Sequence, residues 1–241
     1  MLDVHPPHAP THTWRDFFIH IATIVVGLCI AVGLEQAVEV IHRHHQAAEL
    51  RERLHAESVQ ILFDSQRTDR AETYEALWLK GRIAQVQATV WQKQALASPA
   101  ENKPPYFASP DAPLWRSAKA GALTPLLTQD ETNAFSEVEY VQIRVNEYDE
   151  ACKNATSKRV QFEAQFPPQP GGGVDFTKAS PEDMRAYLAL FTSEAEATTD
   201  YRIWINILIG AEDSILKHDL KLEDIYASER AAHARVNVHL H

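Results

Sequence analysis

The sequence has few residues that interrupt a helix and lacks the short motifs of common catalytic sites. Glycine occurs only 8 times and cysteine twice in 241 residues. Cys29 lies in an apolar stretch and Cys152 in a distant polar one, so we expect no intrachain disulfide. No G-x-S-x-G or H-E-x-x-H pattern occurs, and the glycine run at 171–173 lacks the Lys-Ser/Thr of a phosphate-binding loop. We therefore expect a protein that is not an enzyme and needs no cofactor.

Positive charge is also scarce. The chain has 23 Lys and Arg against 33 Asp and Glu, which gives a formal net charge of -10. No basic stripe with interleaved aromatic residues occurs along the chain. Because such a chain repels phosphates, we exclude nucleic acid as a partner.

One long apolar run is present near the N-terminus. Over residues 17–34 the only strongly polar side chain is His20, which we interpret as a tolerated polar residue and not as a cofactor ligand. Eighteen helical residues span about 27 Å, and residues up to 41 can extend the helix through the headgroups of a bilayer about 30 Å thick. The run lacks a basic leader, a cleavage site and a polar stripe, which argues against a cleaved signal, an interfacial helix and a core helix. We predict a short tail over 1–16 and a transmembrane helix over 17–41, with the lipid bilayer as a partner.

Residues at the start of this run are suited to a membrane interface, and small residues inside it are suited to helix packing. The aromatic rings of Trp14, Phe17 and Phe18 fit the interface, and Arg15 can reach lipid phosphates. Small residues spaced four apart would let two spans approach closely, which predicts self-association or packing against other membrane subunits; the alternative is that these residues are present only because small residues are common in membrane spans. These residues are Gly27, Ala31, Gly33 and Ala37.

The flanking charges leave two orientations open. Arg43, Arg51 and Arg53 follow the run, which favours a cytoplasmic C-terminal part. Against this, Glu35 and Glu39 lie nearest the end of the run, and a short N-terminal tail kept inside is the usual signal-anchor arrangement. We favour the second orientation, which places the large domain in the periplasm.

Histidine and glutamate recur just after the run. The pairs Glu39/His42 and Glu52/His55 would lie about 140° and about 20 Å apart on one helix, so they cannot form one dinuclear site. His42 and His45 share a helix face and, with Glu39, are the candidates for a single ion. We interpret them instead as a polar belt at headgroup level, with lipid headgroup binding or pH sensing as alternatives.

The remaining sequence predicts helices separated by two proline-rich loops. Residues 42–97 are rich in helix formers and predict long membrane-proximal helices with a bend near 64–70. Residues 98–241 form the remainder of the bundle, with loops at 98–113 and 167–179. Thr128 and Ser180 are predicted to cap the two long helices of this part. We predict an all-α protein in which one N-terminal transmembrane helix continues into an antiparallel bundle of about four long helices.

Apolar stripes with alternating spacings of three and four predict the buried faces. Leu50, Leu54 and Ile61 mark the first stripe. The next stripe is expected at Tyr74, Leu77, Gly81, Ala84, Ala88, Trp91 and Ala95. The most regular stripe contains Val138, Val141, Val145, Tyr148, Cys152, Ala155, Arg159, Phe162 and Phe166. Only the arginine breaks it, and its cysteine is expected to be a core residue.

The segment PLWRSAKAGALTPLL, residues 113–127, predicts a short element beside the bundle. Trp115 and Leu123 would bury it, and Gly121 would provide a turn. The segment is either a structural plug at one end of the bundle or an edge that binds a ligand or a partner.

Two segments resemble a known group of proteins. HTWRDFFIHIATIVVGLCIAVGLEQAVE resembles the anchor of uncharacterised bacterial single-span membrane proteins, and PLWRSAKAGALTPL resembles a segment downstream in them. The resemblance implies a bacterial inner-membrane protein with a helical extramembrane domain and assigns no functional residue. We predict a membrane-anchored, non-enzymatic accessory or scaffold subunit. The alternatives are a small-ligand-sensing helical module and a metal- or cofactor-binding protein.

Overall fold

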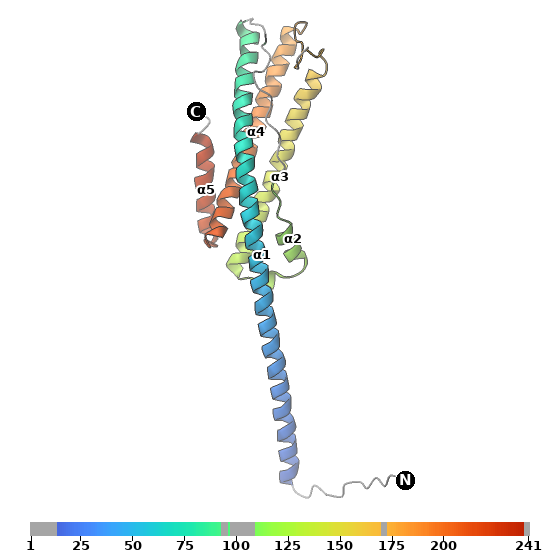
Figure 1. Ribbon diagram of the computed structural model, residues 1–241, viewed down its shortest axis with the longest axis vertical. Coiled ribbons are helices and arrows are strands. Elements are labelled where there is room, and N and C mark those ends of the chain that lie inside the picture. Colours follow the sequence, from blue (N-terminus) through green and yellow to red (C-terminus); the bar gives the residue numbers. More distant parts are fainter. Residues whose placement is uncertain (1–13, 93–95, 97–108, 170–172, 239–241) are drawn as a thin grey trace, which may run out of the picture. The chain divides into compact units, whose positions relative to one another are not determined.

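The protein is helical throughout the part of the chain that the structure describes. The computed structural model describes residues 14–92, 96, 109–169 and 173–238. Within these residues there is no β-strand, only an isolated bridge between Pro168 and Val174. The elements, in chain order, are α1 (Trp14–Gln92), α2 (Pro113–Ala120), the 3-10 turn η1 (Thr124–Leu126), α3 (Gln129–Glu163), α4 (Pro181–Leu216) and α5 (Leu222–Val238) (Figure 1). The predicted all-α class is confirmed.

The chain divides into two compact units, Met1–Leu50 and Arg51–His241. In the first unit the described residues are helical and belong to α1, which begins at Trp14, three residues before the predicted start of the span. The first 13 residues of the predicted tail lie outside the described residues. α1 is one helix of 79 residues and continues through residues 64–70, where we predicted a bend.

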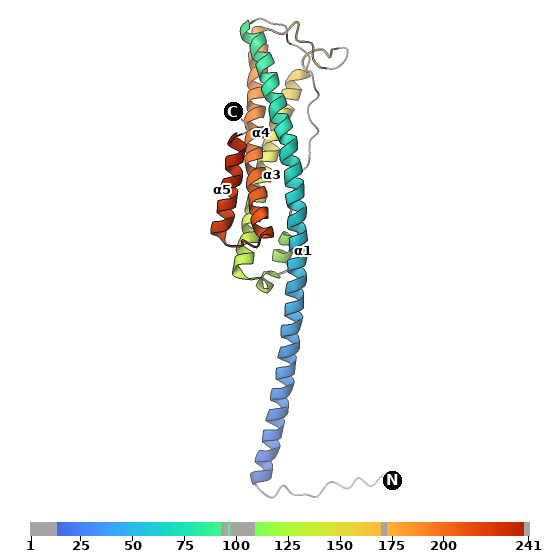
Figure 2. The same ribbon diagram turned by 60° about the vertical axis from the view of Figure 1, so that its left-hand side comes forward.

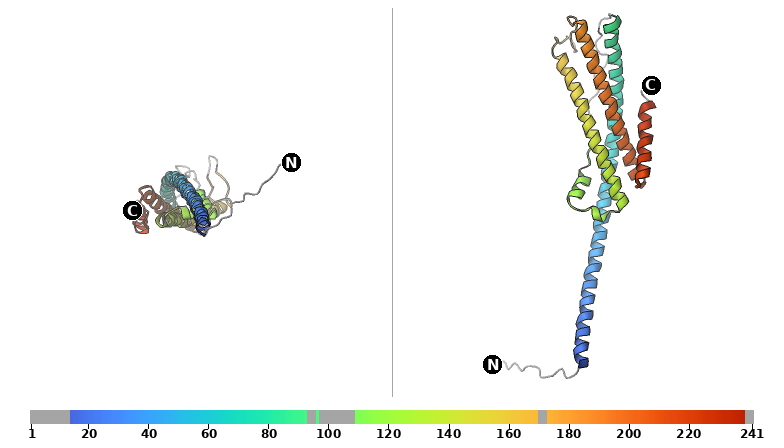
Figure 3. Two further views of the ribbon diagram at one scale, coloured as in Figure 1. Left: turned by 90° about the horizontal axis from the view of Figure 1, so that it is seen from below. Right: turned by 180° about the vertical axis from the view of Figure 1, so that it is seen from behind.

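In the second unit, α1, α3 and α4 lie side by side and α5 packs along α4 (Figures 2 and 3). α1 and α3 run in the same direction, since Arg51 and Glu131 join their first turns in this unit with an ion pair of 2.5 Å. α4 runs in the opposite direction, because Asn206 near its end binds Asp69 whereas Met184 near its start packs in a cluster with Val86. The alternating order of the predicted bundle therefore holds for α3, α4 and α5, and α1 lies parallel to α3.

The starts of α3 and α4 form where the sequence predicts them. The Thr128 hydroxyl accepts a hydrogen bond from the Glu131 amide, and the Glu131 carboxylate accepts one from the Thr128 amide. Ser180 and Asp183 make the same reciprocal pair at the start of α4, with Pro181 in the first turn. These capping boxes satisfy amide groups that have no partner inside the helix.

Gly210 lets α4 and α5 approach each other closely. A Cβ atom at this position would lie 2.7 Å from the Ser228 carbonyl oxygen of α5, which is closer than real Cβ contacts. Only glycine therefore fits without a shift of the backbone of α5. Gly210 ends a stretch of α4, residues 201–210, in which Tyr201, Ile205 and Leu208 are fully buried.

The predicted stripe on α3 is confirmed. Each of its residues is buried or half-buried, including Cys152 and the arginine that breaks the pattern, Arg159. α4 contributes Phe191 and Ile205 to the same interior, both fully buried. On these two helices the large apolar side chains decide which face is buried.

The predicted stripe on the second part of α1 is wrong. Tyr74, Leu77 and Trp91 are exposed by 67%, 58% and 67%, and Ala95 lies outside the described residues. The buried face of α1 lies on the other side of the helix, where most residues are polar. It contains Leu54, Ser58, Ile61, Ser65, Thr68, Glu72, Glu75, Leu79, Arg82 and Val86. Hydrophobicity therefore marks the wrong face here, and polar contacts with α4 occur on the buried side, where Asp69 meets Asn206 and Arg202.

Candidate functional site

The first candidate site is the apolar part of α1, a candidate membrane span. It is the one described helix that is long and apolar enough to cross a bilayer, and none of its most apolar window is buried. At its start the rings of Trp14, Phe17 and Phe18 are exposed and contact one another at centroid distances of 5.8 to 6.0 Å, and Arg15 is exposed beside them. The Thr23 hydroxyl donates to the Ile19 carbonyl oxygen at 2.9 Å, so this polar group needs no outside partner.

The small residues of the span lie open on the helix surface. A Cβ atom added at Gly27 or Gly33 would meet no other atom within 4 Å. Ala31 and Ala37 are exposed as well. The structure therefore leaves these positions accessible to another helix.

The juxtamembrane histidines and glutamates engage neighbours on their own helix. Glu39 accepts a hydrogen bond from Arg43 at 2.5 Å, and His42 is bonded to Gln46 at 3.0 Å. His45 is exposed, as are the members of the other pair, Glu52 and His55. Among the residues described, no group of three or more His, Cys, Asp and Glu is arranged to hold a metal ion.

Trp115 lies in the interior and fixes α2 to α1 and α3. Its ring is 2% exposed and lies 5.5 Å from the Phe135 ring, and its Nε1 donates to Glu139 at 3.2 Å. The backbone amides of Leu114 and Trp115 donate to the Glu57 carboxylate of α1 at 2.7 and 3.2 Å. An acid at a helix start satisfies free amides and complements the helix dipole.

The other two residues predicted at this edge lie at the surface. Gly121 ends α2 and is exposed, and Leu123 is exposed as well. The turn itself depends on Ala122, which has a positive φ of 53°. Trp115 therefore does not share an open surface with Gly121 and Leu123.

A buried ion pair joins α3 and α4. The Arg159 guanidinium donates to both carboxylate oxygens of Glu194, and Arg159 also binds Glu163 at 2.7 Å. It lies 5.6 and 5.1 Å from the ring centroids of Trp78 and Phe191. Burial alone would lower the pKa of Arg159. The carboxylates of Glu194 and Glu163 have the larger effect, so the pKa is raised. The guanidinium is therefore charged at every physiological pH.

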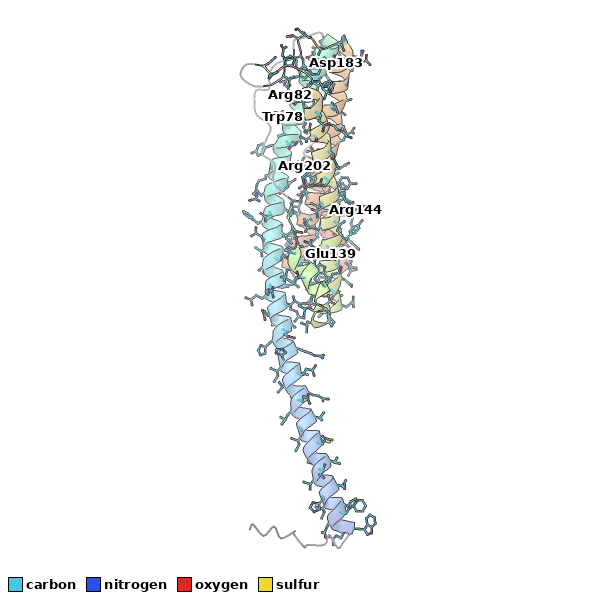
Figure 4. All side chains as sticks on the ribbon, turned by 90° about the vertical axis from the view of Figure 1, so that its right-hand side faces the viewer. Trp78, Arg82, Glu139, Arg144, Asp183 and Arg202 are labelled. Atoms are coloured by element: carbon cyan, nitrogen blue, oxygen red, sulfur yellow. The ribbon has the colours of Figure 1, made fainter. Side chains whose placement is uncertain are left out.

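A second polar layer joins α1 and α4. Asn206 donates to Asp69 at 2.7 Å, and Arg202 lies 3.6 Å from the same carboxylate. Figure 4 shows Arg82, Trp78 and Arg202 at successive levels along this unit. Buried near this layer, the hydroxyls of Ser65 and Thr68 have no hydrogen-bond partner among the described residues.

Cys152 faces this polar interior. Burial, followed by the nearby carboxylates of Glu72 and Glu75, raises the pKa of its thiol. The thiol therefore stays protonated at neutral pH and is a poor nucleophile.

Two glutamates near the α4–α5 contact hold protons near neutral pH. The pKa of Glu212 is raised to about 8: burial is the main cause, a hydrogen bond from Ser58 opposes the shift, and the charge of Glu57 contributes to it. Burial, followed by the charge of Glu137, raises the pKa of Glu229 to about 7. At neutral pH the Glu212 carboxyl group is mostly uncharged in the folded protein.

Sequence reasoning missed most of these interior groups. Glu75, Arg82, Glu194 and Arg202 were not identified as interior residues from the sequence, and all are buried. A signal was present on α1, since its buried polar residues recur at intervals of three, four and seven from residue 58 to residue 82, all of which keep them on one face of a helix.

Comparison of the chain with protein-family models, with curated proteins and with solved structures finds no match. Function is therefore inferred from the chain's own residues.

Proposed function

We propose that this protein is a single-span protein of the bacterial inner membrane that acts through protein contacts of its helical unit, residues 51–241. The supporting observation is the apolar part of α1, whose side chains are exposed between Trp14 and Ile41. Soluble proteins rarely expose a continuous apolar surface of this kind, and each buried side chain of Leu or Ile size gains about 1.5–3 kcal/mol. A bilayer removes this surface from water. We favour a periplasmic location for the helical unit because Glu35 and Glu39 lie nearest the end of the apolar part; Arg43, Arg51 and Arg53, which follow them, favour the opposite side.

The interior of the helical unit supports a structural use of its charged residues. Arg159 is held by Glu194, and Arg202 lies beside Asp69, so these charges join one helix to another. Such pairs fix which helix faces meet, because a shifted register would leave a buried charge without a partner. We therefore assign the interior to stability and the surface to function, as expected of an accessory or scaffold subunit that catalyses no reaction.

Membrane fractionation of the full chain tests the anchor. The protein is expected to pellet with membranes, to resist extraction at alkaline pH and to be released by detergent. Val25→Asp and Leu28→Asp together should move it to the supernatant, since a charge at the centre of a span costs about 3 kcal/mol on insertion scales. Val25→Leu and Leu28→Val serve as the matched control. A wild-type chain found in the supernatant without detergent would contradict the anchor.

Crosslinking in native membranes tests the protein contacts. We expect crosslinked species that contain the full chain together with other proteins or further copies of it. A chain that remains monomeric and without partners in membranes would contradict the accessory role.

Small-ligand binding inside the bundle is a second candidate function, favoured by one observation. The buried Ser65 and Thr68 hydroxyls and Arg202 Nε lack hydrogen-bond partners among the described residues. Bound water or a small polar ligand between α1 and α4 would satisfy them. A thermal-shift screen tests this: a ligand should raise the Tm of the wild type and not that of Thr68→Val. If no compound in a panel of polar metabolites raises the Tm, this candidate is rejected.

A further inference from the structure

One face of α1 carries apolar side chains that no described part of the chain covers. Tyr74, Leu77 and Trp91 are exposed, and Gly81 and Ala84 lie exposed between them. The spacings of these residues are three, four, three and seven, which is the periodicity of a coiled-coil seam. The buried residues of α1 lie on the opposite side of the helix, so this seam points away from α3 and α4.

The same face of α1 is positively charged although the chain as a whole is negative. Among the exposed residues between positions 59 and 92, the charged ones are Arg67, Arg70 and Lys80, and none is a carboxylate. Arg67 pairs with Asp64 at 3.2 Å. Arg70 and Lys80 form no ion pair within the described part of the chain. A partner surface that is complementary in charge to this face of α1 is therefore acidic.

The first half of α4 carries a face with complementary chemistry. Ala186, Ala189 and Ser193 are exposed at intervals of three and four, and Glu196 and Asp200 continue the same line. Neither acid has an ion-pair partner among the described residues. Small side chains at this spacing let another helix approach closely.

At the start of α4 this face carries charges of both signs. Glu182 extends the line by a further step of four residues, and Arg185 is the one cation exposed between residues 181 and 200. The face therefore keeps an excess of negative charge, concentrated at Glu196 and Asp200.

The α1 face and the α4 face also lie at the same level along the bundle axis. Within one chain the Trp78 and Phe191 rings lie 5.9 Å apart, and Arg202 lies 3.6 Å from Asp69. α1 and α4 are antiparallel and share the same rise per residue, so these contacts set the levels of all other positions.

Two copies side by side at equal height would bring complementary residues together. Arg70 of one copy lies level with position 200 of the other, which is an aspartate. Leu77 lies level with position 193, a serine, and Gly81 lies level with position 189, an alanine. Large side chains thus meet small ones, and the cation meets an acid. The alternative, α1 against α1 in parallel, would place Arg70 against Arg70.

We propose that a second copy of this chain covers the exposed face of α1 (residues 70–91) with the exposed face of its α4 (residues 182–200), the two helices antiparallel. This inference rests on the proposed function and deepens it by naming the chain itself as one partner.

Charge reversal in the full chain, kept in detergent or in nanodiscs, tests this pairing. Arg70→Glu with Lys80→Glu reverses the α1 face, and Glu196→Lys with Asp200→Lys reverses the α4 face. Each double variant should weaken self-association about tenfold or more, because the Arg70–Asp200 pair and the net attraction between the two faces become repulsive. All four changes in one chain, or a mixture of the two double variants, should restore association to within about threefold of wild type. Lys158→Glu on α3, exposed and outside both faces, is the control.

A disulfide measurement separates this contact from the other possible ones. In a chain with Cys29→Ala and Cys152→Ala, the pair Leu77→Cys and Ser193→Cys should form a disulfide between copies in native membranes. Efficient crosslinking of Leu77→Cys alone would overturn the proposal in favour of contact between two α1 helices. Reversals that leave association unchanged, or a loss that the four-residue swap does not restore, would overturn it too. Circular dichroism of every variant shows whether the helices are intact.

The two proposals fail differently. A chain that pellets with membranes and crosslinks to other proteins but never to itself overturns this inference and leaves the proposed function standing. A chain that stays in the supernatant contradicts the proposed function, whatever its state of association.

Discussion

The buried carboxyl group of Glu212 should make the helical unit less stable as the pH rises. Its ordinary pKa is 4.5, and burial raises the pKa to about 8 in the folded protein. Between these two values the folded state holds a proton that the unfolded state does not. Unfolding therefore releases a proton, and the free energy of unfolding falls as the pH rises from about 4.5 to about 8. The stability associated with the protonated form is complete below about pH 4.5.

The size of the effect follows from the two pKa values. One pKa unit corresponds to 1.36 kcal/mol, so at pH 7 the cost of keeping Glu212 neutral is about 3 kcal/mol. Glu212→Gln keeps the size of the side chain and removes this cost. We expect the variant to be more stable than the wild type by about 3 kcal/mol at pH 7 and by less than about 1 kcal/mol at pH 5. For a unit of this size the gain at pH 7 corresponds to about 6–12 °C in Tm.

Thermal unfolding of the full chain in mild detergent, followed by circular dichroism at pH 5, 6, 7 and 8, measures the difference. Glu229→Gln is the matched control, because burial also raises the pKa of Glu229, to about 7, but that residue is only half-buried. Its replacement should change the pH dependence less than Glu212→Gln does. The reasoning is refuted if Glu212→Gln lowers the Tm at pH 8 or leaves the pH dependence equal to that of the wild type.

Three further sets of substitutions test the packing of the second unit by the same unfolding measurement. Gly210→Ala should cost about 1–3 kcal/mol and increase hydrogen exchange in α5, because its Cβ meets the α5 backbone; unchanged exchange in α5 would contradict the close approach. Glu194→Ala should cost about 3–5 kcal/mol by leaving the charge of Arg159 buried, and Arg159→Met in the same chain should recover part of it; no recovery would argue against the pair. At a dilution where the chain is monomeric, Leu79→Ala should cost about 2–5 kcal/mol and Leu77→Ala under about 0.5 kcal/mol, since in one copy the first side chain is buried and the second exposed; equal costs would contradict the assignment of the α1 faces.

The starts of α3 and α4 could be predicted from the sequence because the signals for them are local. A capping residue and its partner lie three positions apart, as Thr128 and Glu131 do. The buried faces of α3 and α4 could be predicted too, since both carry many large apolar side chains that are stable only out of water. Phe191 is buried for that reason alone.

The buried charges could not be predicted, because the burial of a charge depends on a partner from another helix. Arg159 and Glu194 lie 35 positions apart, and each alone resembles an ordinary surface residue. Burial becomes favourable only when the counter-charge and further hydrogen bonds are supplied together. Arg159 was visible as the break in an apolar stripe, but nothing local identified Glu194 as its partner.

In the second part of α1, too, the buried face could not be predicted from the sequence. Its buried face contains Glu75 and Arg82, and its exposed face contains Tyr74 and Leu77, so hydrophobicity alone assigns both faces wrongly. The two faces of α1 differ in how their side chains are stabilised. On the buried side Asp69 meets Asn206 and Arg202 of α4, whereas the apolar side chains of the exposed face remain in contact with water. Covering that face stabilises the helix without disturbing the interior. The apolar pattern on this helix is therefore better understood as a signal for contact with another molecule than as a signal for the core of its own bundle.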